Sequence, residues 1–221
     1  MQLIRLVLLL IVPLGLAACA SVETASRNAL TYEAAAGETR APVTQPYKVV
    51  DIRVLVPDTL EVSEANSFFP FADIVWREDP RGDRRAQVAA ILRDAARRGT
   101  RALDSGRAVI LELEVTRFHA LTQKTRFTIG GTHDIRFFLR VLDAETGAML
   151  APQRLVALKF TAYGGARALA AMARGETQKV RITAHVARRI ARDLAPNDAP
   201  VFARLDPGGH PHDKPGLPMR P

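Results

Sequence analysis

Residues 107–118 read RAVILELEVTRF, and their apolar and polar side chains alternate with the two-residue period of a β-strand. One face carries Val109, Leu111, Leu113 and Val115, and the other carries Glu112, Glu114 and Thr116. A sheet with one face on a core and one face in water produces this alternation. The stretch is the clearest strand in the chain.

A second alternating stretch, 133–142, is the best partner for this strand. Its apolar face carries Ile135, Phe137, Leu139 and Val141, opposite Asp134, Arg136 and Arg140. In an antiparallel pair, Glu112 and Glu114 would meet Arg136 and Arg140 across the sheet. We therefore interpret the two glutamates as ion-pair partners on a solvated face, and not as a catalytic carboxylate pair.

Other short stretches predict the remaining strands and turns. Residues 47–56 form a strand with Val50, Ile52, Val54 and Val56 on one face, and residues 149–160 form another with Val156, Leu158 and Phe160 on one face. Asp143-Ala144-Glu145-Thr146-Gly147 predicts a tight hairpin turn. Residues 73–76 are a candidate for a short extra strand, and residues 121–132 are expected to form a mobile hairpin tip.

Three stretches have the character of helices. The first, residues 83–98, begins with the N-cap candidate Asp83 and places Val88, Ile91, Leu92 and Ala95 on one face. The second, residues 166–174, is rich in alanine. The third, residues 177–194, begins with the N-cap candidate Thr177. The predicted core face of this last helix carries Val180, Ala184, Ala187, Ala191 and Leu194.

The order strand, helix, three strands, helix predicts the fold class. The first two strands are joined through a helix and can be parallel, whereas the last three form an antiparallel meander. We expect an α+β two-layer sandwich with a mixed four-stranded sheet (β-α-β-β-β-α) and the helices on one face.

The N-terminal segment has the pattern of a bacterial lipoprotein leader. Arg5 precedes an apolar stretch at 6–16, which is shorter than the roughly 20 residues that a bilayer crossing needs. Leu16-Ala17-Ala18-Cys19 resembles a lipobox, which implies cleavage before Cys19 and acylation of that residue, the only cysteine. An ordinary secreted protein is the alternative.

These features divide the chain into four predicted parts: a signal peptide at 1–18, a lipid anchor and flexible tether at 19–46, a globular domain at 47–195 and a disordered tail rich in proline and glycine at 196–221. The tether would reach roughly 30 Å as a flexible coil. By analogy with the sorting rules of bacterial lipoproteins, Ala20 in place of an aspartate favours the outer membrane over the inner one.

The chain of 221 residues carries a net charge of +8 at pH 7. A basic domain suggests an anionic partner. Export argues against nucleic acid, so anionic lipid headgroups, lipopolysaccharide phosphates and acidic envelope proteins remain as candidate partners. A solvated surface rich in arginine is the simpler alternative.

Two surfaces are candidate binding sites. The first is a basic stripe on the last helix, formed by Arg181, His185, Arg188 and Arg192. The second is an aromatic patch formed by Phe68, Phe69, Phe71 and Trp76. The alternatives are a solvated helix face for the stripe and a loop that folds its aromatic side chains over the core for the patch.

The sequence offers no catalytic motif. It lacks a Gly-x-Ser-x-Gly elbow and a His-Glu-x-x-His pair, and we interpret His119 and His133 as structural. His210 and His212 lack a third ligand nearby, so no metal site and no cofactor are expected. The sequence therefore predicts a protein that is not an enzyme.

Several motifs resemble a family of proteobacterial proteins that are regarded as lipoproteins and have no known function. They are Asp73-Ile74-Val75-Trp76, Gly82-Asp83-Arg84, Gly130-Gly131-Thr132-His133-Asp134-Ile135, Asp143-Ala144-Glu145-Thr146-Gly147-Ala148 and Thr177-Gln178-Lys179-Val180-Arg181-Ile182 with His185. The resemblance implies the compartment and the extent of the domain, and no activity. The order of elements is also similar to lipopolysaccharide-assembly and transporter-auxiliary lipoproteins.

These observations lead to one main functional hypothesis and two alternatives. The main hypothesis is a membrane-anchored envelope lipoprotein that serves as a non-catalytic binding or assembly module. The first alternative is an accessory protein that binds or transports anionic lipid or lipopolysaccharide. The second is an unrecognised hydrolase.

Overall fold

The computed structural model describes residues 46–195. The predicted leader and lipobox, with Leu16, Ala17, Ala18 and Cys19, lie outside the described residues, as do most of the tether and the tail with His210 and His212. Within the described part of the chain, no helix has both the length and the apolar character that crossing a bilayer requires.

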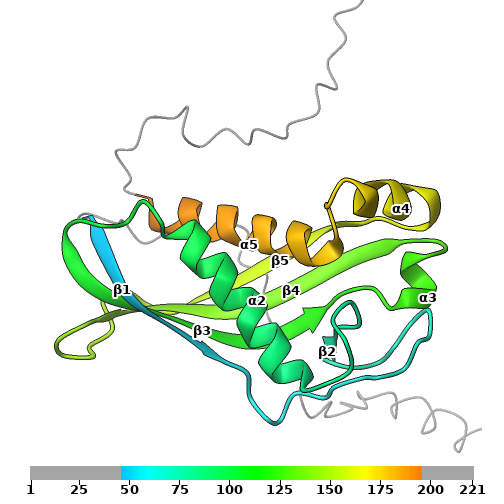
Figure 1. The fold of residues 1–221 in the computed structure, drawn as a ribbon. Helices are drawn as coiled ribbons and strands as arrows, with labels where there is room; N and C mark the ends of the chain where they lie inside the picture. The colour runs from blue at the N-terminus through cyan, green and yellow to red at the C-terminus, as the bar shows by residue number, and fades with distance from the viewer. Residues whose placement is uncertain (1–45, 196–221) are drawn as a thin grey trace, which may run out of the picture. The chain divides into compact units, whose positions relative to one another are not determined.

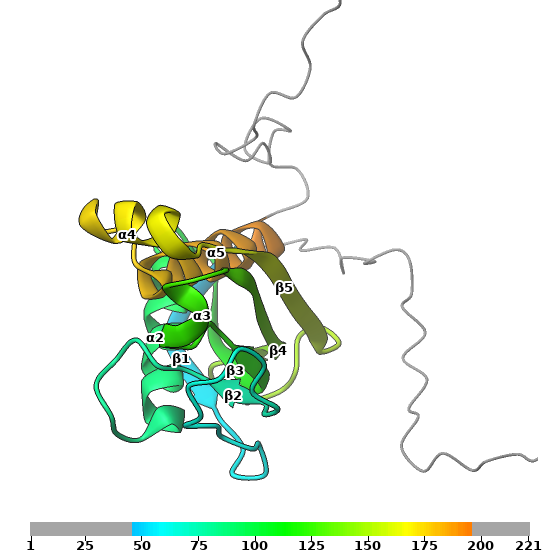
Figure 2. The same ribbon diagram turned by 90° about the vertical axis from the view of Figure 1, so that its right-hand side faces the viewer.

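The described residues form a mixed sheet with its helices on one face. The elements are β1 (Tyr47–Leu55), β2 (Ile74–Val75), α2 (Arg84–Gly99), β3 (Arg107–His119), α3 (Gln123–Arg126), β4 (Gly131–Asp143), β5 (Arg154–Ala162), α4 (Gly165–Ala173) and α5 (Gln178–Leu194). The strand order is β1-β3-β4-β5, with β1 parallel to β3 and the later pairs antiparallel. Helices α2 and α5 lie side by side over the sheet (Figures 1 and 2).

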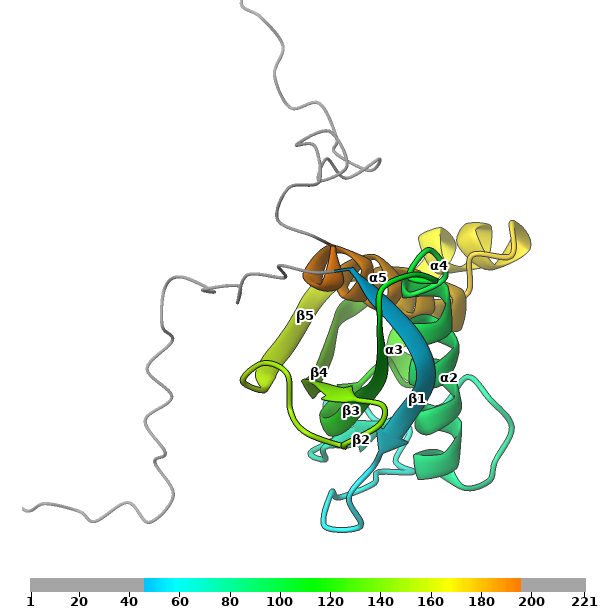
Figure 3. The same ribbon diagram turned by 90° about the vertical axis from the view of Figure 1, so that its left-hand side faces the viewer.

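This arrangement confirms the predicted two-layer α+β sandwich, but the sheet has five strands and not four. β1 leaves β3 where Leu55 lies opposite Glu114, and β2 pairs with β3 further along, opposite Phe118 and His119. β2 lies within residues 73–76 and confirms the short extra strand predicted there, which the predicted four-stranded sheet did not count. The edge strand β1 is seen most clearly in Figure 3.

The core between α2 and the sheet is the predicted one. Val88, Ile91, Leu92 and Ala95 of α2 are buried, and Asp83 caps the helix by accepting a hydrogen bond from the Ala86 amide at 3.0 Å. The apolar faces of β3 and β4 are buried beneath the helices, as expected.

The predicted core face of α5 is wrong. Ile182, Val186 and Ile190 are buried, whereas Val180 is 49% exposed. The row at 182, 186 and 190 follows the i, i+4 spacing with branched side chains, and it buries more apolar area than the alanine row. Leu194 is buried, as predicted.

β1 also departs from the predicted face at one residue. The register of β1 against β3 shifts between Val49 and Asp51, which marks a bulge. The extra residue turns Val50 outward, while Val49, Ile52 and Val54 pack against the core. An alternating sequence pattern cannot show such a shift.

On the face of the sheet away from the helices, Arg140 forms the ion pairs predicted for it. Arg140 donates to Glu112 at 2.8 Å and to Glu114 at 2.6 Å. Arg136 instead binds Asp134, two residues away on the same face of β4. Both glutamates therefore have structural partners, which supports their interpretation as ion-pair residues.

Candidate functional site

The candidate site is built around the segment that follows β2, where the chain leaves the core. Trp76 is fully buried and packs edge-on against Phe118, with ring centroids 5.8 Å apart. Its indole Nε1 donates to Asp79 at 2.9 Å. This contact fixes the start of a tight segment, residues 77–80, which lies beside the N-terminal ends of α2 and α5.

Glu78 connects this segment to α5. Its carboxylate accepts hydrogen bonds from the backbone amides of Gln178 and Lys179, both at 3.1 Å, and from Arg126 at 2.7 Å. A negative charge is favourable at a helix N-terminus, where the backbone amides lack partners within the helix. The side chain of Glu78 is thus committed to holding α5 and α3 in place.

Asp79 is the second carboxylate of the segment. Burial raises its pKa, but hydrogen bonds from Lys179 at 2.9 Å and from Trp76 outweigh burial, so the pKa lies below its ordinary value. Asp79 is therefore ionised at neutral pH and paired with Lys179.

Arg84, the first residue of α2, is the buried cation of the site, with a side chain that is only 4% exposed. Its Nη1 donates to the carbonyl oxygens of Asp79 and Pro80, each at 3.1 Å, and to the Gln87 side chain at 2.7 Å. These three neutral acceptors fix the position of the guanidinium group.

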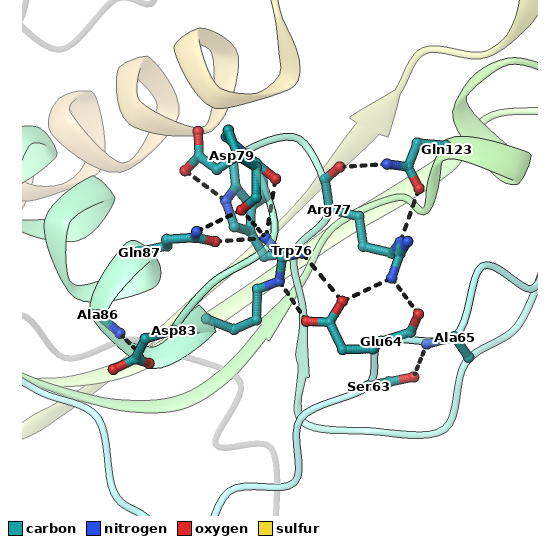
Figure 4. Close-up of polar contacts among 12 residues, drawn as sticks. Ser63, Glu64, Ala65, Trp76, Arg77, Asp79, Asp83, Ala86, Gln87 and Gln123 are labelled. Carbon is teal, nitrogen blue, oxygen red and sulfur yellow. Dashed lines mark hydrogen bonds and ion pairs between the residues drawn. The ribbon is translucent and has the colours of Figure 1, made fainter.

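Glu64 supplies the charge that balances Arg84. Arg84 donates hydrogen bonds to both carboxylate oxygens of Glu64, from Nε to Oε1 at 2.6 Å and from Nη2 to Oε2 at 3.2 Å. Arg77 donates to the same Oε2 at 2.9 Å and to the Glu64 carbonyl oxygen (Figure 4). The hydrogen bond from Arg84 and the nearby charges of Arg77 and Arg81 hold the pKa of Glu64 below its ordinary value.

α3 closes the other side of the site. Gln123 accepts from Arg77 Nε at 2.9 Å and donates back to the Arg77 carbonyl oxygen at 3.0 Å. Thr122 and Thr125 of the same region bind the carbonyl oxygen of Ser67. The region predicted to be a mobile hairpin tip is therefore a packed helical turn, because its threonines and glutamine bind neighbouring loops.

Together these residues line a cavity of about 430 Å³, which we call the arginine pocket. Its lining consists of Glu64, Arg77, Glu78, Asp79, Pro80, Arg81, Arg84 and Gln123. Glu78 and Asp79 are also paired with Arg126 and Lys179, which lie behind the lining. Arg77 and Arg84 thus share the carboxylate of Glu64, and Arg81 adds a third guanidinium group to a lining that holds three arginines and three carboxylates.

A second cavity of about 430 Å³ lies between β1 and the end of α2. Its charged lining residues, Lys48, Asp51, Arg97, Arg101 and Asp104, are all exposed. The arginine pocket differs because it contains a buried, positioned cation, and for this reason we regard it as the candidate site.

The predicted basic stripe is divided in the structure. Arg181 donates to the Thr161 carbonyl oxygen at 2.8 Å and stacks over Tyr163, and His185 stacks on Phe160 with ring centroids 3.9 Å apart. Only Arg188 and Arg192 of the stripe are exposed.

The predicted aromatic patch is divided as well. Trp76 belongs to the core and cannot form part of a docking surface. Phe68 lies beneath the Lys124 ammonium group at 4.5 Å, whereas Phe69 and Phe71 are exposed, Phe71 by 96%. Neither part of the patch lines the arginine pocket.

The two histidines of the strands are placed as structural residues. His133 is completely buried beside Phe160, and burial lowers its pKa to about 3. His119 contacts the Pro70 carbonyl oxygen at 3.1 Å. Within residues 46–195, no group of three or more potential ligands could hold a metal ion.

Sequence reasoning missed Glu64, Arg77 and Gln123 as site residues, because isolated polar residues in loops have no periodicity. Arg84 did carry a signal. It opens α2, where the helix dipole favours acidic residues, and the first turn of this helix contains none. A cation in that position needs another reason, and the ion pair with Glu64 provides it.

Several solved structures resemble this one. A candidate lipoprotein from Caulobacter crescentus is 25% identical, with 48% of this chain and 79% of that chain covered and a TM-score of 0.30. A DUF330 protein from Xanthomonas campestris is 12% identical, with 71% and 90% covered and a TM-score of 0.39. The PelC dodecamer from Paraburkholderia phytofirmans is 11% identical, with 71% and 91% covered and a TM-score of 0.31.

No curated protein matches the chain. The sequence model of one protein family matches residues 47–205, which include every element from β1 to α5. This match confirms that the chain belongs to a family of unknown function, whereas the lipobox and the lipoprotein character of the family stay predictions. The chain belongs to DUF6778, a family of unknown function.

Proposed function

We propose that this protein is a lipid-anchored module of the bacterial cell envelope that binds an acidic group of another envelope protein in the arginine pocket and catalyses no reaction. The lipobox that ends at Cys19 supports the anchor and the compartment. The tether at 19–46 would hold the domain away from the membrane surface.

The observation that carries the proposal is the convergence of Arg77 and Arg84 on a single carboxylate in a cavity. Guanidinium groups bind carboxylates through parallel, charge-assisted hydrogen bonds, which are stronger than neutral ones and specific in geometry. Arg84 is positioned by neutral acceptors and carries its charge in a buried place. A site of this kind recognises an anion.

The carboxylates of the pocket favour binding over catalysis. The pKa values of Glu64 and Asp79 lie below their ordinary values, so both groups are ionised at neutral pH. A general acid requires a raised pKa, and a base must be able to accept a proton near pH 7. Carboxylates held by arginine and lysine have neither property.

The test is capture of crosslinked envelope proteins by the full-length chain in its native host. We expect a specific partner with the unchanged protein and a loss of at least about tenfold with Arg81→Glu, because Arg81 is an exposed cation at the pocket. Arg101→Glu, which changes an exposed arginine of the second cavity, is the matched control. Equal recovery with both variants would contradict the proposal.

A second candidate function is binding to anionic lipid through α5. Arg188 and Arg192 are exposed and lie one helical turn apart, so both can approach a membrane surface. The double variant Arg188→Glu, Arg192→Glu should lose binding to vesicles that contain phosphatidylglycerol. Unchanged vesicle binding would exclude this surface.

A further inference from the structure

We infer that the Glu64 side chain is an internal stand-in for the ligand. It occupies the place that an aspartate or glutamate side chain of the partner takes on binding, so that one carboxylate is exchanged for another. This inference rests on the proposed function. It adds the class of ligand, an acidic protein segment, and a reason why the isolated domain would bind small anions weakly.

The geometry around Glu64 is that of a carboxylate receptor. Three N–H groups from two arginines reach its two oxygens, at distances of 2.6, 2.9 and 3.2 Å. The Nε and Nη2 groups of Arg84 form the two-pronged contact that matches a planar carboxylate. Because the group that occupies this place is itself a carboxylate, we assign an acidic side chain as the ligand, and the comparison with phosphate below tests this class.

Both arginines have further contacts that do not involve the Glu64 carboxylate. Arg84 also binds the carbonyl oxygens of Asp79 and Pro80 and the Gln87 side chain, and Arg77 also binds Gln123. All of these are neutral acceptors. The receptor is thus preorganised, but the charge of Arg84 is buried and requires an anion at this place.

Glu64 can leave this place by rotation of its side chain alone. The side chain is 37% exposed, so solvent reaches the carboxylate. The loop is held on both sides of Glu64, because the Ser63 amide donates to the Ile74 carbonyl oxygen at 3.0 Å and the Asn66 side-chain oxygen accepts from the Lys124 amide at 2.8 Å. The exchange needs no rearrangement of the loop.

An internal ligand lowers the apparent affinity for an external one. The tethered carboxylate competes at an effective concentration of about millimolar or higher. A small carboxylate therefore binds poorly, whereas an acidic segment with further contacts can compete. Removal of the Glu64 carboxylate should expose the site.

The experiment is chemical rescue of the full-length protein with propionate, which reproduces the end of a glutamate side chain. Glu64→Ala should unfold at a lower temperature than the unchanged protein, because the Arg84 charge loses its partner. Propionate should restore most of this loss, and calorimetry should show binding at least about tenfold tighter than to the unchanged protein. Glu61→Ala, which removes an exposed carboxylate of the same loop, should show no such response.

Two further arms make the outcome decisive. Adding Arg77→Ala to Glu64→Ala should abolish the response to propionate, since a receptor arginine is then missing. Inorganic phosphate at equal ionic strength should restore less than propionate does. If Glu64→Ala fails to fold, the same measurements are made on Glu64→Gln, which removes the charge and retains the size of the side chain.

Equal responses to propionate in the unchanged protein, the Glu64 variants and Glu61→Ala would overturn the inference and leave Glu64 as a structural ion pair. A response to phosphate that exceeds the response to propionate would overturn the ligand class. Neither result depends on partner capture, which tests the proposed function. If Arg81→Glu loses partner capture but propionate fails to rescue Glu64→Ala, the proposed binding function is supported. The inference that Glu64 takes the place of the ligand is then refuted.

Discussion

Arg84 is the residue on which the account of the pocket depends. A buried arginine requires a compensating anion, and the free energy of an ion pair seldom exceeds the cost of desolvating both charges. The pair with Glu64 is therefore a poor device for stability alone. Its position in the lining of a cavity favours the proposed role in binding.

Replacing Arg84 tests this position directly. Arg84→Ala removes five hydrogen bonds to four residues and should lower the free energy of unfolding by about 3 kcal/mol. Arg81→Ala, at an exposed cation of the same pocket, should change it by less than about 0.5 kcal/mol. Urea unfolding measures both values, and equal effects would mean that Arg84 is not held as described.

His133 predicts a dependence of stability on pH. Its pKa is about 3 in the folded chain and about 6.5 in the unfolded chain, so below pH 6.5 only the unfolded chain takes up the proton. Stability should therefore fall between pH 6.5 and about pH 3, by up to about 1.4 kcal/mol per pH unit.

The variant His133→Leu should remove this part of the pH dependence. Urea unfolding at pH 7.5, 6 and 5 compares the two proteins above the range in which carboxylates with lowered pKa values titrate. As the pH falls, the unfolding free energy of the unchanged protein should decrease more than that of His133→Leu. A difference that stays constant from pH 7.5 to pH 5 would contradict the burial of a neutral imidazole.

At the level of elements, alternating patterns predicted the main strands and helices but not their irregularities. β3, β4 and α2 have the predicted faces because large apolar residues repeat at one period along their whole length. A short strand at 73–76 was predicted, but the bulge in β1 and the pairing of β2 with β3 depend on how the edge of β3 is filled. Such tertiary pairing leaves no periodic trace in the sequence.

The corrected face of α5 leads to a comparison of two substitutions. Ile190→Ala should lower the free energy of unfolding by about 3 kcal/mol, because it leaves a cavity in the core. Val180→Ala, on the predicted but exposed row, should cost less than about 0.5 kcal/mol. The opposite order in urea unfolding would restore the alanine face as the buried one.

At the level of the whole molecule, the sequence predicted the architecture and missed the candidate site. The order of elements and the parallel pairing through α2 follow from local patterns and general rules of connection. The arginine pocket instead combines Glu64, residues 77–84 and Gln123, which belong to separate loops and helix ends. Only the folded chain brings these residues together.

The anchor is a separate prediction about the whole molecule. Mass spectrometry of the protein from its native host should show a mature chain that begins at Cys19 and carries fatty acids. The variant Cys19→Ser should keep its leader and should lose the lipid. An unmodified cysteine or an intact leader in the unchanged protein would contradict the lipobox prediction.

The most direct test of the central claim is site-specific photo-crosslinking from the arginine pocket in intact cells. A photoreactive amino acid at position 80, an exposed lining position that contributes only its backbone carbonyl oxygen to the contacts with Arg84 and Gln87, should give one major crosslinked partner in the full-length protein, and adding Arg77→Glu should abolish that product. The same photoreactive residue at position 101 should give no such product. If position 80 yields no more crosslinking than position 101, the arginine pocket is not the binding site.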